Sequence, residues 1–68
     1  MDNRMRELRE DNDLSQREVA EKLGITQRKY SYIETGTQQL TDEILVGLSK
    51  IYNVTTDYIL RLTDKKRN

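Results

Sequence analysis

One local pattern occurs four times in this chain: an apolar residue, then a Ser or Thr, then a second apolar residue four positions after the hydroxyl. The four copies are Leu14-Ser15…Val19, Ile25-Thr26…Tyr30, Leu40-Thr41…Leu45 and Val54-Thr55…Ile59. A hydroxyl in this place caps the free N–H groups of a helix's first turn, and the flanking apolar pair forms a hydrophobic staple that fixes the entry angle. The pattern therefore predicts four short helices, each beginning directly after its hydroxyl residue.

Glycines indicate where two of these helices end. Gly24 and Gly36 can take the left-handed conformation of a helix C-cap, so we expect helices over 16–23 and 27–35. Gly47 lies near the edge of an apolar stripe. There we expect a tolerated surface glycine, in preference to a close backbone contact.

Apolar spacing supplies the remaining helices. A clear stripe predicts a helix over 42–52, and a weaker one predicts a helix over 56–62. A further helix over 3–12 turns Met5 and Leu8 inward. No segment alternates like a strand, so the expected fold class is all-α with five helices.

The composition excludes several kinds of function. The chain has 68 residues with no His and no Cys, so it forms one small domain without a disulfide scaffold, a zinc site of the usual ligand types or a histidine-based triad. So small a body cannot enclose a substrate. We therefore expect no enzyme, no cofactor and no metal.

Charge and hydropathy limit the kinds of molecule that this chain can bind. Twelve basic residues balance twelve acidic residues, which at first argues against nucleic acid because phosphate binding leaves a basic footprint. The charge is uneven, however, because residues 61–68 hold four basic groups against one acidic group. No apolar run approaches the roughly 18 residues of a membrane span, and no signal-peptide core is present, so we expect a cytoplasmic protein away from membranes.

The second and third expected helices are joined by only three residues, 24–26, the length of the sharp turn in a helix-turn-helix unit. Ala20 is small enough for the two helices to cross closely. Ile25, Tyr30 and Ile33 supply apolar residues for a shared core. A generic helical hairpin does not need this order of residues, which therefore favours the specific motif.

These residues resemble the helix-turn-helix DNA-binding domains of the phage-repressor and Cro type, also called lambda-repressor-like. The matching segments are Leu14-Ser15-Gln16-Arg17-Glu18-Val19-Ala20-Glu21-Lys22-Leu23-Gly24-Ile25-Thr26-Gln27, Tyr30-Ser31-Tyr32-Ile33-Glu34-Thr35-Gly36 and Leu45…Leu48…Asn53-Val54. The resemblance implies a compact five-helix domain over 1–62, followed by a short polar and basic tail over 63–68. It also implies a transcriptional repressor or activator that is usually dimeric.

A helical wheel separates the two faces of the helix over 27–35. Tyr30 and Ile33 point one way, and the polar side chains point the other way. In helix-turn-helix proteins the N-terminal part of this helix enters the major groove. The candidates for reading bases are Gln27, Arg28, Ser31 and Tyr32.

Each candidate has a chemical role to offer. Gln27 can pair with adenine N6 and N7, Arg28 with guanine O6 and N7, and Ser31 with several base edges, while Tyr32 can meet a thymine methyl group or a phosphate. Neither Gln27 nor Arg28 is favoured as the dominant contact. A merely solvated helix face is the alternative interpretation.

Phosphate contacts are expected nearby. Gln16 opens a helix whose N-terminus favours an anion, and the resemblance also assigns it a backbone contact. Thr26, Lys29 and Gln38 are further candidates. Arg17 is also a candidate for a phosphate contact, and a solvated side chain near the cap explains it equally well.

The resemblance pairs Arg9 with Glu34 in an ion pair that ties two helices together. Both residues are therefore expected to be structural. The loop over 37–40 departs from the family because it has no basic residue, and Leu40 occupies the position of a common Pro. Binding of DNA by one domain alone should be weak.

Together these features predict a sequence-specific DNA-binding transcriptional regulator, with a repressor favoured over an activator. We expect it to bind an inverted repeat in double-stranded DNA as a homodimer. Tyr58, Leu60 and Leu62 are the apolar residues expected to exceed what the core needs. A regulatory protein partner is a further candidate. The alternative function is a protein-interaction module of the same fold, such as an antitoxin-like or antirepressor-binding partner.

Overall fold

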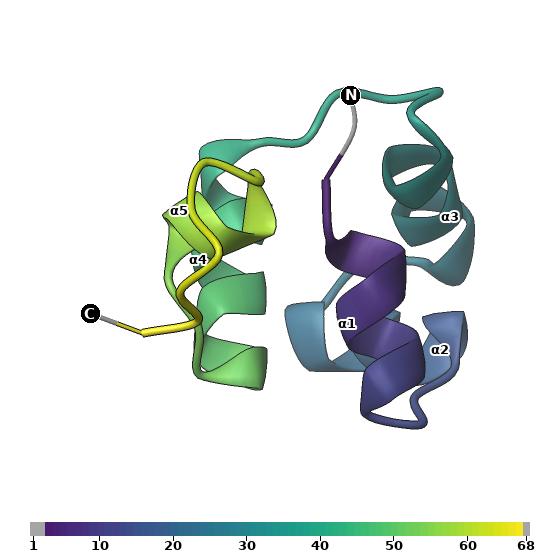
Figure 1. Ribbon diagram of the computed structural model, residues 1–68. Helices are drawn as coiled ribbons and strands as arrows, with labels where there is room; N and C mark the ends of the chain where they lie inside the picture. The colour runs from purple at the N-terminus through teal and green to yellow at the C-terminus, as the bar shows by residue number, and fades with distance from the viewer. Residues whose placement is uncertain (1–2, 68) are drawn as a thin grey trace.

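A computed structural model describes residues 3–67, and within this range the chain forms five helices and no strand. The helices are α1 (Met5–Asp11), α2 (Gln16–Leu23), α3 (Gln27–Thr35), α4 (Asp42–Tyr52) and α5 (Thr56–Ile59). In Figure 1, α4, α5 and the C-terminal segment lie on one side and α3 lies on the other, while α1 lies between them in front of α2. The all-α fold class and its five helices are confirmed.

The predicted capping residues begin four of the helices. Each hydroxyl accepts a hydrogen bond from a first-turn amide: Ser15 from Glu18 at 3.0 Å, Thr26 from Lys29 at 3.1 Å, Thr41 from Ile44 at 3.4 Å and Thr55 from Tyr58 at 3.1 Å. The Ser15 amide in turn donates to the Glu18 carboxylate, which completes a capping box. Gly24 and Gly36 take φ of 73° and 86°, as left-handed C-caps require.

The prediction of a helix over 56–62 was too long. α5 ends at Ile59, and Arg61 adopts a left-handed φ of 61°. The Leu62 amide then donates to the Asp57 carbonyl at 2.9 Å, a bond that closes the helix end in the manner of a Schellman motif. Leu62 is 71% exposed, so a longer helix would gain no stability from burying this side chain.

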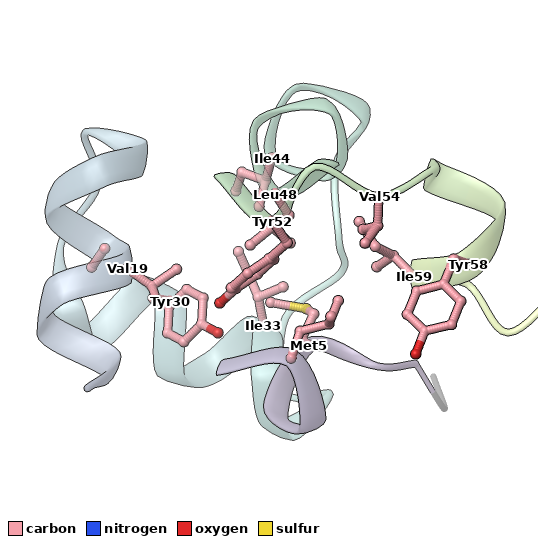
Figure 2. Close-up of a cluster of buried hydrophobic side chains, with 12 residues drawn as sticks. Met5, Val19, Tyr30, Ile33, Ile44, Leu48, Tyr52, Val54, Tyr58 and Ile59 are labelled. Atoms are coloured by element: carbon pink, nitrogen blue, oxygen red, sulfur yellow. The ribbon is translucent and has the colours of Figure 1, made fainter. Parts of the chain in front are cut away.

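The core joins all five helices. Its buried residues are Met5, Leu8, Val19, Ala20, Tyr30, Ile33, Ile44, Leu48, Tyr52, Val54, Tyr58 and Ile59. Figure 2 shows Met5 of α1, Ile33 of α3 and Tyr52 of α4 turned toward one another. The predicted inward positions of α1 and α3 are thus confirmed. Tyr58, expected to be surplus to the core, belongs to it instead.

The expectation of a surface position for Gly47 was wrong. A Cβ atom added there would lie 2.7 Å from Cδ2 of Leu23. α4 and α2 therefore approach closely at this point, and glycine leaves room for the Leu23 side chain. The sequence alone did not show which helix would lie opposite.

The C-terminal segment folds back on α5 and is held there by Arg4. The Arg4 Nε donates to the Tyr58 carbonyl at 2.9 Å, and its guanidinium lies 4.3 Å from the centre of the Tyr58 ring. Its Nη2 pairs with Asp64 at 3.0 Å. The Thr55 amide donates to the Lys66 carbonyl at 2.8 Å. Of the predicted tail, 63–67 is thus held to the domain, and Asn68 lies outside the described residues.

Candidate nucleic-acid interface

α3 presents two chemically different faces. Tyr30 and Ile33 are buried against the other helices. The predicted base-reading side chains lie on the opposite, accessible face: Gln27, Arg28 and Tyr32 are exposed, and Ser31 is half-buried. The cap at the N-terminus of α3 and the buried face behind it fix the orientation of this polar surface.

Two of these side chains are in contact with each other. The Arg28 Nε donates to the Tyr32 Oη at 3.0 Å, and the Arg28 guanidinium lies 5.6 Å from the centre of the Tyr32 ring. Sequence reasoning treated them as separate contacts. Their i,i+4 spacing is the signal that could have revealed the pair, because residues four apart are neighbours on a helix surface.

The predicted phosphate contacts at the starts of the helices have different environments. Gln16 is half-buried at the first position of α2, and Lys29 is exposed. The Thr26 hydroxyl already serves as the α3 cap, since it accepts from the Lys29 amide. The side chain of Arg17 pairs with Glu21 one turn later, at 3.2 Å, with both side chains largely exposed.

The loop after α3 is partly committed to the fold. The backbone N–H of Gln38 donates to the Tyr32 carbonyl at 2.9 Å. That amide is therefore not free for a phosphate, and the exposed side chain of Gln38 is what the loop can offer at this position.

Arg9 and Glu34 form a bidentate ion pair across the domain. The Arg9 Nε and Nη2 each lie 3.0 Å from a different carboxylate oxygen of Glu34. The Arg9 Nη1 also donates to the Leu14 carbonyl at 3.0 Å. With side-chain exposures of 15% and 4%, the pair is largely removed from solvent and connects α1 to α3.

The pair shifts the acidity of both groups. Burial acts to raise the pKa of the Glu34 carboxyl, but the hydrogen bonds and charge of Arg9, together with the neighbouring Tyr30 and Gln16 side chains, outweigh it and hold this pKa below its usual value. The hydrogen bond to Glu34 raises the pKa of Arg9, against the opposing effect of burial. The two groups therefore stay ionised together near neutral pH.

Acid should weaken the fold through Glu34. Its folded-state pKa lies below the unfolded value of about 4.3, so the unfolded chain binds the proton more readily and stability decreases as the pH is lowered. The contribution is complete above that unfolded value and is lost as pH falls through the lower folded-state pKa. The difference in unfolding free energy between the natural chain and Glu34→Gln, measured by denaturant titration, should shrink as the pH falls below the unfolded value. A constant difference would contradict this assignment.

Two buried tyrosines lie near this pair. Burial raises the pKa of Tyr52 to about 12, and burial followed by the neighbouring Glu34 carboxylate raises that of Tyr30 further. Neither phenol oxygen makes a hydrogen bond of ordinary geometry with the described part of the chain. Both tyrosines therefore act in the core as neutral, mainly apolar side chains.

Other kinds of site lack support within the described residues. No three His, Cys, Asp or Glu residues of 3–67 gather in a way that could hold a metal ion. None of the helices in this range has the length and apolar character needed to cross a bilayer.

The short turn between α2 and α3, the buried inner face of α3 and its polar outer face define a helix-turn-helix domain. The sequence profile of the helix-turn-helix family matches residues 5–59. The chain belongs to this family, in its phage-repressor and Cro form.

Relatives in Bacillus subtilis (strain 168) carry the same domain. The chain is 39% identical over 61 residues to the uncharacterized HTH-type transcriptional regulator YobD, covering 90% of this chain and 54% of that protein. It is 39% identical over 57 residues to the HTH-type transcriptional regulator ImmR, covering 84% of this chain and 45% of that protein. The chain thus spans about half the length of these relatives. No solved structure matches it significantly.

Proposed function

We propose that this chain is the sequence-specific DNA-binding domain of a transcriptional regulator, a repressor by preference, which reads the major groove with α3. The observation that carries the proposal is the exposed polar face of α3, with Gln27 and Arg28 in its first turn. These side chains have the donors and acceptors that recognise base edges in the major groove. The names of the related proteins as transcriptional regulators support the same function.

Phosphate contacts in this proposal orient α3 on the duplex. The N-terminus of α2 offers Gln16 and free backbone amides to one strand, and Lys29 supplies a cation beside α3. The Arg17–Glu21 pair and the loop over 37–40 add little positive charge. The affinity of one domain should therefore be low, with a shallow dependence on salt.

A homodimer compensates for this weakness. Two copies on an inverted repeat, with half-sites about one helical turn apart, would combine two weak contacts into one specific complex. Of the three apolar residues near the C-terminus that were expected to exceed the needs of the core, Tyr58 is buried and Leu60 is half-buried. Leu62 remains the largely exposed apolar side chain near the C-terminus.

Selection of binding sequences from random duplex DNA tests the proposal. We expect one enriched motif with inverted symmetry. Arg28→Ala should weaken binding to it about tenfold or more and relax the preference at one base pair. Lys29→Ala should weaken all sequences alike and reduce the salt slope by about one. Arg6→Ala, which removes the same charge from α1, is the control and should bind normally.

The alternative is a protein-interaction module of the same fold. Zero net charge and the exposed side chain of Leu62 favour it. Absence of any enriched sequence at low salt would support this alternative and refute DNA reading by α3.

A further inference from the structure

We infer that Arg28 and Tyr32 act as one unit, in which Tyr32 positions Arg28 to read a guanine with its two terminal nitrogens. The inference rests on the proposed function and goes beyond it by naming the positioning residue and the donor atoms of Arg28 that read the base. The contact that carries it is the 3.0 Å hydrogen bond from the Arg28 Nε to the Tyr32 Oη.

This hydrogen bond divides the donors of the guanidinium. An arginine has five N–H donors in a planar fork, one on Nε and four on the two Nη atoms. Tyr32 engages the single Nε donor. The Nη1 and Nη2 donors remain, and this pair matches the O6 and N7 acceptors that guanine presents in the major groove. Adenine presents a donor in place of O6, so it cannot accept both bonds.

The same contact lowers the cost of ordering Arg28. A free arginine on a helix surface has many rotamers, and fixing them opposes binding. The ring of Tyr32 lies 5.6 Å from the Arg28 guanidinium and limits its positions before DNA arrives. The backbone of Tyr32 is fixed by the fold, because it lies in α3 and its carbonyl accepts the Gln38 amide of the following loop at 2.9 Å. Tyr32 is thus a positioning residue, and a thymine or phosphate contact of its own is not needed.

Gln27 differs from Arg28 in this respect. Within the described residues its exposed side chain has no hydrogen bond of ordinary geometry to a neighbour. It must therefore be ordered entirely by the DNA. This difference favours Arg28 as the dominant base contact, a choice that the sequence left open.

The test uses duplexes carrying the enriched motif, with each guanine replaced in turn by 7-deazaguanine, which lacks the N7 acceptor. We expect one guanine whose replacement weakens the natural chain about tenfold and leaves Arg28→Ala unaffected. Tyr32→Phe keeps the ring and removes the hydroxyl. It should weaken binding about threefold and reduce the penalty at that guanine.

A double mutant separates positioning from direct contact. Tyr32→Phe should have no further effect in the Arg28→Ala background, and its thermal midpoint and salt slope should match those of the natural chain. Two results would overturn this inference and leave the proposed function intact. One is that Tyr32→Phe weakens binding equally in the natural chain and in Arg28→Ala, and the other is that no guanine of the motif has a 7-deazaguanine penalty that Arg28→Ala removes. Selection that enriches no sequence would refute the proposed function, and this inference with it.

Discussion

Replacing Glu34 with Ala is expected to lower the free energy of unfolding by about 3 kcal/mol, because it leaves the Arg9 guanidinium in a largely buried place without its partner. Both hydrogen bonds of the ion pair are lost, and with them the polar contact that connects α1 to α3. In a domain of this size that loss corresponds to a fall of about 12 °C or more in the unfolding midpoint. Thermal and urea unfolding followed by circular dichroism measure it.

The matched controls are Glu21→Ala and Arg17→Ala. They break a pair of the same chemistry whose side chains are 67% and 76% exposed. A pair in water contributes little, so each change should cost less than about 1 kcal/mol. Equal effects of Glu34→Ala and Arg17→Ala would contradict a structural role for the buried pair.

Replacing Arg4 with Ala should have the next largest effect, a loss of about 2 kcal/mol, because the residue makes charged hydrogen bonds and a cation–π contact while largely buried. Its side chain is 13% exposed and reaches the Tyr58 carbonyl, the Tyr58 ring and Asp64. Without it, the segment over 60–67 should separate from α5. Hydrogen exchange at the Thr55 amide, which donates to the Lys66 carbonyl, would report that separation directly.

Arg6→Ala is the control for this change. Arg6 lies two residues further along, in α1, is 73% exposed and pairs with Glu10 at 3.4 Å. Its loss should cost less than about 0.5 kcal/mol and leave exchange at Thr55 unaltered. Comparable destabilisation by Arg4→Ala and Arg6→Ala would refute the role assigned to Arg4.

The helices could be predicted from sequence wherever local chemistry decides their limits. Hydroxyl caps such as Ser15 act on amides within one turn, and Gly24 ends α2 through its own backbone preference. Three helices, α2, α3 and α4, have the predicted bounds for this reason. Neither signal depends on what lies across the domain.

The remaining features depend on residues far apart in the chain. The close contact at Gly47 arises from Leu23 on another helix, and the Tyr58 ring is covered by Arg4 from the other end of the chain. The early end of α5 is a local feature instead: a backbone bond between Leu62 and Asp57 closes it, and Arg61 takes the left-handed conformation without the glycine that would mark it in the sequence. Apolar spacing predicts which face of a helix turns inward, and it does not identify the neighbour.

The site divides in the same way. The polar face of α3 follows from helical geometry, since Tyr30 and Ile33 must face the core. The contact between Arg28 and Tyr32 depends on rotamers, and the use of the Gln38 amide depends on the course of a loop. These contacts decide which donors remain for a ligand, so they refine the chemistry of a surface whose location was predictable.

Arg9 in α1 and Arg4 directly before it connect the N-terminal helix to distant parts of the chain, and this has a consequence for the order of folding. Arg9 reaches a residue 25 positions away and Arg4 one 54 positions away, whereas the turns that join α2, α3 and α4 are short. Contacts between distant residues require closure of long loops, which is slow compared with forming local turns. We therefore expect α2 to α4 to assemble first and α1 to dock late. Substitutions of Arg4 and Arg9 should then mainly accelerate unfolding and leave the folding rate nearly unchanged.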